Sequence, residues 1–267
     1  MIGVYEKSMP VEMPFKDKLI TAKNAGFDFM ELSVDETEEK LNRLFGGDFL
    51  NEEKRAVSEA GLPVMTMCLS GHRKYPLGDP NPKIRQKSLE IMRAAVDFAF
   101  KSGIRIIQLA GYDVYYGEST EKTRADFKVN LKKCVDFASD KGVILAFETM
   151  ETPFMNTIEK AVKYVSEINS PYLQVYPDMG NIRNGAADYL KDIEFGKGHI
   201  AACHLKETKE GVYRNLFFGE GRVDFKGCIE ALKKQGVNIY NCEFWYDGKS
   251  EPLAYLKKAR DYFKNLL

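Results

Sequence analysis

The sequence lacks several features that mark whole classes of protein. Its five cysteines form no CxxC pair, and this odd, unspaced set indicates free thiols in a reducing compartment. No stretch is long and apolar enough to span a membrane. The opening segment MIGVYEKSMP has no charged region followed by an apolar core, so it does not resemble a signal peptide. We therefore expect a cytoplasmic protein without a membrane partner.

An excess of charge of one sign is also missing. Lys and Arg together number 39, as do Asp and Glu, so the formal net charge is zero. A nucleic-acid-binding surface normally gives a domain a clear basic excess. We therefore expect a small-molecule ligand and no nucleic-acid partner.

No linker, low-complexity tract or change of composition divides the 267 residues. Instead one phrase recurs, in which a helical pattern is followed by a glycine and then by a short β-rich run. It reads KNAGFDFMEL, SEAGLPVMTM, FKSGIRIIQL, SDKGVILAFE and KKQGVNIYNCEF. A glycine just past the end of a helix adopts the left-handed conformation without a Cβ penalty. We expect this conformation at Gly26, Gly61, Gly103, Gly142 and Gly236.

Read along the chain, the β-rich runs predict eight strands: Ile2–Tyr5, Phe29–Leu32, Val64–Leu69, Arg105–Leu109, Ile144–Glu148, Leu173–Tyr176, Ile200–Leu205 and Ile239–Phe244. The clearest helical patterns between them cover Lys83–Lys101, Glu121–Ser139, Thr157–Ile168 and Pro252–Asn265. Alternating elements predict an α/β fold with a parallel sheet, and eight units predict a single (β/α)8 TIM barrel over residues 1–267. An open doubly wound sheet is the alternative, but no Gly-rich phosphate fingerprint follows the first strand.

Four of the β-rich runs end on a side chain that can bind a metal. VILAFE ends on Glu148, LQVYPD on Asp178, and IAACHL and NIYNCEF carry His204 and Glu243 near their ends. Alone, each residue would be read as a solvated strand end or a hydrogen-bonded core residue. The carboxyl ends of barrel strands meet at one face, so we expect the four to share one divalent ion. One imidazole and three carboxylates suit Zn²⁺ or Mn²⁺, with Mg²⁺ and Co²⁺ as alternatives.

Such a site suits proton abstraction beside a carbonyl group. A divalent ion that chelates the carbonyl and hydroxyl oxygens of a sugar stabilises a developing enediolate. Glu148 and Glu243 belong to the fifth and eighth predicted strands and would face the substrate from opposite sides. Proton removal by one and return by the other would epimerise the carbon. The alternative is that both glutamates are ligands only and that the base lies elsewhere.

Longer strings carry a family resemblance that runs in order along nearly the whole chain: GVYEKSMP, GFDFMELSVDE, MCLSGHRKYPLG, IQLAGYDVYYGE, YPDMGNI, HLKETKEGV, FGEGRVDF and EFW. The sequence resembles the L-ribulose-5-phosphate 3-epimerases, also called L-xylulose-5-phosphate 3-epimerases, which are xylose isomerase-like TIM barrels. The resemblance implies C3 epimerisation of these ketopentose phosphates in L-ascorbate or related sugar catabolism. It implies metal binding by Glu148, Asp178, His204 and Glu243, with the two glutamates as the acid–base pair. By analogy with the superfamily we also expect a homodimer.

Further polar residues near strand ends are candidates for binding the sugar phosphate. A phosphate group needs cations or N–H donors, and the candidates are Lys7, His72, Arg73 and Lys206. For each of them a solvated surface charge is the alternative. Gln108 is a candidate for a hydrogen bond to the sugar, and the alternative is a polar residue of the barrel rim that is bonded to backbone. Glu31, which lies near the end of the second predicted strand, has the same two interpretations. Asn181 stands where related ketose epimerases have a substrate-binding histidine.

Three competing functions use the same barrel. Another sugar isomerase of the superfamily would move a proton between C1 and C2 with the same groups. An apurinic endonuclease would need a richer metal cluster and a basic surface, whereas the chain has three histidines and no net charge. A non-catalytic metal or sugar-phosphate-binding barrel is the third, and the pairing of Glu148 with Glu243 argues against it. The aromatic loop YDVYYG is expected either to cover the site or to form an oligomer contact.

Overall fold

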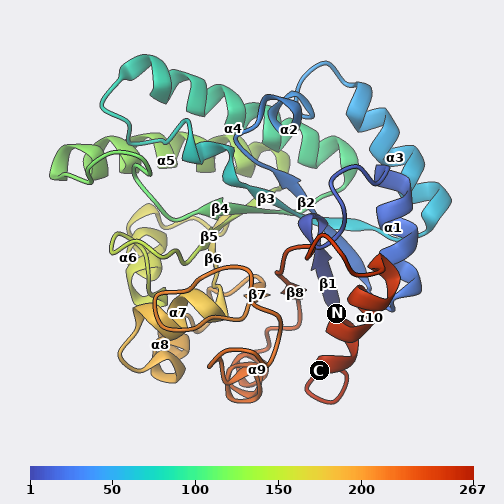
Figure 1. Ribbon diagram of the computed structural model, residues 1–267. Coiled ribbons are helices and arrows are strands. Elements are labelled where there is room, and N and C mark those ends of the chain that lie inside the picture. Colours follow the sequence, from blue (N-terminus) through green and yellow to red (C-terminus); the bar gives the residue numbers. More distant parts are fainter.

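The computed structural model describes residues 1–267, with eight strands at the centre and helices around them (Figure 1). The strands are β1 (Ile2–Tyr5), β2 (Phe29–Val34), β3 (Val64–Leu69), β4 (Ile106–Ala110), β5 (Ile144–Glu148), β6 (Leu173–Tyr176), β7 (Cys203–Leu205) and β8 (Tyr240–Cys242). The helices are α1 (Phe15–Asn24), α2 (Glu38–Asn42), α3 (Asp48–Ala60), α4 (Pro82–Ser102), α5 (Glu121–Lys141), α6 (Ile158–Ile168), α7 (Met179–Gly185), α8 (Tyr189–Phe195), α9 (Phe225–Lys234) and α10 (Pro252–Tyr262), with two 3₁₀ helices, η1 (Glu6–Ser8) and η2 (Ser70–Arg73).

The order of the strands closes the sheet into a barrel. Neighbours follow the order β6-β5-β4-β3-β2-β1-β8-β7, and every paired strand is parallel. The seam between β6 and β7 is held by two isolated bridges, Val175 with Ile200 and Asp178 with His204. The predicted (β/α)8 TIM barrel is therefore confirmed, with one sparsely bonded seam.

The strand boundaries differ from the prediction mainly beside this seam. Four strands, β1, β3, β5 and β6, have the predicted bounds. The seventh strand was expected over Ile200–Leu205, but regular pairing covers only Cys203–Leu205, because Pro177 has no N–H to donate across the seam. Its carbonyl still accepts a hydrogen bond of 2.9 Å from the backbone N–H of His204. The eighth strand is likewise shorter than expected.

Glycines end the helices as the sequence predicts. All five recurring glycines have φ between 65° and 91°. Gly103, for example, follows α4 and donates its N–H to the carbonyl of Ala99 at 3.0 Å. These left-handed residues turn the chain sharply from each helix into the next strand.

Alternation along the strands separates an apolar core from a polar interior. Successive strand residues point to opposite faces of the sheet. Met30 and Leu32 therefore join the main apolar core beneath the helices, whereas Glu31 between them points into the barrel. A small apolar layer lies inside the barrel, formed by Ile106, Ala146, Tyr176 and Ala202. Buried polar side chains share the barrel interior with this layer, and they position the site.

Two further expectations concern membranes and thiols. Every helix is either too short or too polar to traverse a lipid bilayer. All five cysteines are buried and unpaired, which confirms the expected free thiols.

Candidate active site

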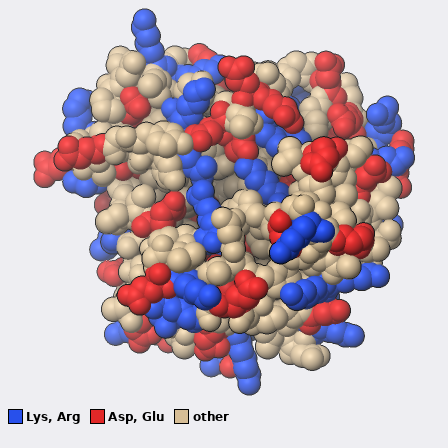
Figure 2. All heavy atoms as spheres, viewed as in Figure 1, with Lys and Arg blue, Asp and Glu red and all other residues tan.

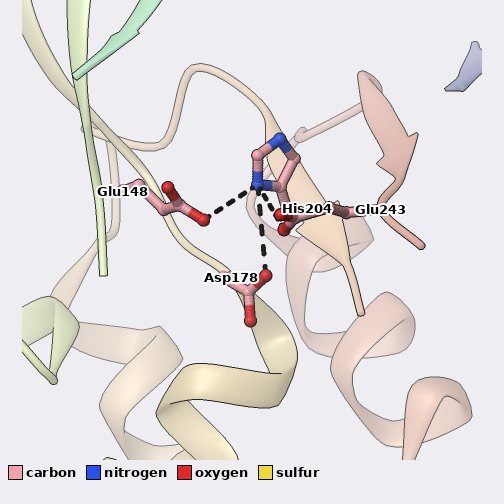
Figure 3. Close-up of side chains that lie close together, drawn as sticks. All are labelled: Glu148, Asp178, His204 and Glu243. Atoms are coloured by element: carbon pink, nitrogen blue, oxygen red, sulfur yellow. Dashed lines mark hydrogen bonds and ion pairs between the residues drawn. The ribbon is translucent and has the colours of Figure 1, made fainter. Parts of the chain in front are cut away.

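Four side chains from different parts of the chain converge within the barrel (Figure 3). Glu148 ends β5, Asp178 follows β6, His204 lies in β7 and Glu243 follows β8. Nδ1 of His204 lies 3.2 Å from Glu148 Oε1, 3.1 Å from Glu243 Oε2 and 4.0 Å from Asp178 Oδ2. One ligand atom of each residue lies within 4.8 Å of the others, and all four residues are buried. The convergence that the strand ends predict is therefore present.

Asp178 is held in place by the helix that it begins. It is the N-cap of α7, and its Oδ1 accepts a hydrogen bond of 2.6 Å from the backbone N–H of Asn181. Its own N–H donates to the hydroxyl of Thr149 at 3.0 Å. These bonds fix the carboxylate by capping and leave Oδ2 facing the cluster.

The three carboxyl groups of the cluster lie close together and favour a positive charge between them. Burial lowers the pKa of His204, but the carboxylates of Glu31 and Glu243 outweigh it and the net shift is well upward. Burial and the nearby Glu243 raise the pKa of Glu148. Burial also raises that of Glu243, but Lys206 and His204 outweigh it and hold the pKa below its usual range. The protein thus provides an acidic cavity that favours a bound cation.

The donor set fits a divalent metal ion. Asp178 Oδ2 and Glu243 Oε2 are buried without a hydrogen-bond partner. Lys206 Nζ approaches them at 3.1 Å and 3.6 Å, close enough for ion pairs but outside hydrogen-bond geometry at either oxygen. An ion pair without directed hydrogen bonds leaves part of the cost of burying a carboxylate uncompensated. Three carboxylates and one imidazole are ligands that would remove this cost by coordination.

A cavity opens beside the cluster, and both Glu148 and Glu243 line it. Four cationic side chains line the same cavity: Lys7, Arg73, Lys206 and Arg214. Figure 2 shows Lys and Arg side chains bordering the hollow near the centre of this face. Such a cavity joins a carboxylate-rich floor to a cationic wall, an arrangement that suits an anionic substrate.

Three of the predicted substrate-binding residues line this cavity. Lys7 Nζ pairs with Asp35 Oδ2 at 2.5 Å, and Lys206 pairs with the acids described above. Arg73 has no carboxylate partner. Its guanidinium lies over the ring of Tyr115, 4.9 Å from the ring centroid, and its buried Nε has no hydrogen-bond partner. Arg73 is thus the free cation of the cavity wall.

The other three predicted residues lie beside or behind the cavity. Gln108 donates its side-chain N–H to Glu148 Oε2, and Asn181 donates to the carbonyl of Thr149 at 2.7 Å. His72 places Nε2 3.2 Å from the carbonyl of Ser88 in α4, and burial lowers its pKa to about 4. None of the three is among the residues that line the cavity.

Sequence reasoning passed over several side chains of the cavity wall, including Glu151, Tyr213, Arg214 and Trp245. Each lies in a loop that follows a predicted strand, which is the only feature of the sequence that pointed to them. The aromatic loop also reaches this region, because the hydroxyl of Tyr115 donates to Glu151 Oε1 at 3.5 Å. Which loop residues line the cavity depends on the folded path of each loop and not on their spacing in the sequence.

Comparison with known proteins agrees with this architecture. The model of the xylose isomerase-like TIM barrel family matches residues 19–266. L-ribulose-5-phosphate 3-epimerase UlaE from Salmonella heidelberg (strain SL476) is 46% identical over 268 residues, covering 98% of this chain and 93% of the relative. The enzyme of the same name from Escherichia coli gives the same identity and coverage.

Solved structures show the same fold at lower identity. D-allulose 3-epimerase from Methylomonas sp., in complex with D-allulose, has a TM-score of 0.81 at 19% identity and covers 100% of this chain and 96% of that one. The IOLI protein with a bound zinc atom has a TM-score of 0.82 at 16% identity, covering 99% and 97% of the two chains. The solved structures show the fold, whereas the relatives that are 46% identical and the family model show the family. The chain belongs to the L-ribulose-5-phosphate 3-epimerase family of the xylose isomerase-like TIM barrels.

Proposed function

We propose that this protein is a metal-dependent epimerase that inverts C3 of L-xylulose 5-phosphate to give L-ribulose 5-phosphate, and the reverse. The observation that carries the proposal is the placement of Glu148 and Glu243 on two sides of His204 at the floor of one cavity (Figure 3). The relatives that are 46% identical bear the name of this activity.

Glu148, Asp178, His204 and Glu243 would hold one divalent ion, with Zn²⁺ or Mn²⁺ proposed first and Mg²⁺ or Co²⁺ as alternatives. When bound, the ion supplies Lewis-acid stabilisation of the negative charge that develops on the substrate oxygens. The unbonded oxygens of Asp178 and Glu243 support this assignment.

Epimerisation then needs a proton acceptor and a proton donor on opposite faces of C3. One glutamate takes the proton from C3 on its carboxylate oxygen, and the electron pair of the C–H bond moves into the enediolate of the sugar. The other glutamate delivers a proton to the opposite face, so nothing is oxidised or reduced. Gln108 supports this role of Glu148, because its N–H group donates to Oε2 and holds the carboxylate in orientation.

The phosphate group is proposed to bind at the cationic wall. Arg73 is the strongest of the candidates, since its guanidinium lines the cavity and has no acidic partner. Lys7 and Lys206 line the cavity as well, although each already pairs with carboxylates. A planar guanidinium can donate two hydrogen bonds to one phosphate. We do not assign His72 to this role, because its ring faces the backbone of α4.

One experiment tests the reaction directly. The purified protein is incubated with L-xylulose 5-phosphate in D₂O and followed by NMR. We expect deuterium at C3 together with formation of L-ribulose 5-phosphate. Deuterium at C1 or C2 with an aldose product would identify a sugar isomerase instead. No isotope exchange in metal-supplemented protein would point to a non-catalytic binding barrel.

Two expectations accompany this proposal. The unpaired buried thiols are consistent with a cytoplasmic location. A homodimer stays a prediction, which light scattering coupled to gel filtration would test.

A further inference from the structure

The segment between β7 and α9, residues 206–224, contains no helix or strand of its own, yet it forms part of the cavity wall. It carries Tyr213 and Arg214 to the cavity. Arg214 lies between two other loops, with its guanidinium 3.7 Å from Glu151 Oε1 and 5.8 Å from the centroid of the Trp245 ring. Something must hold this long segment in place, because backbone without regular pairing is otherwise mobile.

Glu207 sits at the base of this segment and is only 2% exposed. Its Oε1 accepts backbone hydrogen bonds from Thr208 at 3.0 Å and from Val223 at 3.1 Å. Its Oε2 accepts a third bond from the backbone N–H of Gly219 at 2.9 Å. No Lys, Arg or His side chain forms an ion pair with Glu207, so these three N–H groups are its main compensation for burial.

The segment is shaped around this carboxylate. A Cβ at position 221 would overlap Glu207 Oε1 and the carbonyl of Thr208, so only glycine fits there. The backbone N–H of Arg222 donates to the same Thr208 carbonyl at 3.0 Å. Glu207 therefore ties the beginning of the segment to its end and closes residues 206–224 into a loop.

The middle of the loop is fixed separately. Phe217 and Phe218 pack against Phe244, with ring centroids 5.6 Å and 5.4 Å apart. The section that bears Tyr213 and Arg214 lies between this aromatic anchor and the carboxylate clamp at the base. Lys209 and Val212 also exchange two backbone hydrogen bonds of 3.0 Å just before it. Loss of either anchor would therefore loosen the path that carries Arg214 to the cavity wall.

We propose that Glu207 is a positioning residue, which holds Arg214 against the cavity so that it contacts the distal end of an anionic substrate. The proposal rests on the proposed epimerase function for its kinetic consequence, but the clamp itself does not. Glu207 lies one residue beyond Lys206, which approaches Asp178 and Glu243. The hydrogen bonds of Glu207 go to the backbone of its own loop and not to the cluster, so we expect its effect on substrate binding rather than on proton transfer.

The first test measures the loop without any substrate. In Glu207→Gln an NH₂ group replaces one of the two carboxylate oxygens. This group donates hydrogen bonds and cannot accept them from the backbone N–H groups that it faces. We expect amide hydrogen exchange to accelerate at least about tenfold within residues 206–224, and to stay unchanged in β5. The matched control is Glu210→Gln, because Glu210 belongs to the same loop, its side chain is 91% exposed, and its ion pair with Arg222 at 3.6 Å is a surface contact of little energy. Unchanged exchange in a folded Glu207→Gln protein would overturn the proposal.

The second test is kinetic. We expect KM for L-xylulose 5-phosphate to rise about tenfold in Glu207→Gln, with kcat changed less than about twofold and metal content unchanged. The double variant of Glu207→Gln with Arg214→Ala should show the KM of Arg214→Ala alone, because both changes remove the same contact between Arg214 and the substrate. If the KM increases of the two single variants multiply in the double variant, the link between Glu207 and Arg214 is overturned. If the wild-type protein does not epimerise the sugar at all, the proposed function fails, while the exchange experiment still decides the clamp.

Discussion

Glu31 lies behind His204 and contacts the ring nitrogen that faces away from the acidic cluster. Its Oε1 is 2.6 Å from Nε2 of His204. Three more donors reach the same carboxylate: Asn241 at 2.8 Å on Oε1, and Thr66 at 2.7 Å and Tyr176 at 3.0 Å on Oε2. When a metal binds and His204 is neutral, Glu31 would keep the proton on Nε2 and leave Nδ1 to coordinate the ion.

Replacing Glu31 with Gln should therefore weaken metal binding. We expect the Kd for Zn²⁺ or Mn²⁺ to rise about 10–100-fold, because the imidazole loses its orienting carboxylate. Competition with a chelator of known affinity measures this directly, and circular dichroism checks the fold. Glu230→Gln, on the exposed face of α9, serves as the control and should bind metal normally. Unchanged affinity in Glu31→Gln would show that His204 needs no such support.

The two-base mechanism predicts a distinct outcome for each glutamate. Glu148→Gln and Glu243→Gln should each lower epimerisation by about 10²–10⁴-fold even with excess metal, since general acid–base catalysis contributes factors of this size. Each variant keeps one carboxylate, so each should still exchange C3 hydrogen with D₂O in one epimer only. The two variants should exchange opposite epimers. Near-normal turnover in either one would rule out the paired roles.

Metal removal should abolish activity and lower stability together. Exhaustive chelation would remove the proposed cation, whose charge would offset those of the buried carboxylates of Glu148, Asp178 and Glu243. A ligand present at 100 times its Kd stabilises the folded state by about 2.7 kcal/mol. We expect a lower midpoint of thermal unfolding after chelation and recovery of both properties on adding Zn²⁺ or Mn²⁺. Full activity in protein shown to be metal-free by elemental analysis would contradict the proposed role of the ion.

Much of the architecture could be predicted because it depends on local patterns. Glycines such as Gly61 and Gly142 mark helix ends by their freedom to adopt positive φ. Residues at the carboxyl ends of parallel strands must converge in a barrel, and this rule alone predicts that Glu148 and His204 lie together.

The remaining features depend on contacts between distant segments. Glu31 gave no local sign of its four buried donors, which come from β3, β6, β7 and β8. His72 lies in a loop that follows a strand, like Arg73 beside it, yet its ring turns toward α4. Spacing places both residues at the same rim, and only packing decides which one reaches the cavity.

Arg73 should be needed for the phosphate and not for the sugar. We expect Arg73→Met to raise KM for L-xylulose 5-phosphate at least about tenfold, because a hydrogen bond to a charged group contributes about 1.5–3 kcal/mol. Activity toward unphosphorylated L-xylulose, where measurable, should change little. Lys74→Met removes a neighbouring exposed cation and is the matched control. Equal loss with both sugars would assign Arg73 to the architecture of the site instead.

Glu6 should make stability depend on acid pH. It is fully buried against Lys40 at 2.6 Å, Arg43 at 2.8 Å and Lys18 at 3.4 Å. Burial raises its pKa, but Arg43 and Lys40 outweigh this and lower it from 4.5 to about 2. A depressed carboxyl pKa stabilises the folded state above the unfolded value, and this contribution disappears as the pH falls from about 4.5 to about 2. The shift corresponds to about 3 kcal/mol.

Urea unfolding between pH 2 and pH 7 measures this contribution. The wild-type free energy of unfolding should decrease as the pH falls through that window, and Glu6→Gln should lack this component. At pH 7 the variant should be about 3–5 kcal/mol less stable, because the buried Lys18 and Lys40 and the partly buried Arg43 lose their partner. Glu12→Gln replaces an exposed acid nearby and should follow the wild-type curve. Parallel pH profiles for wild type and Glu6→Gln would show that other carboxyls govern acid unfolding.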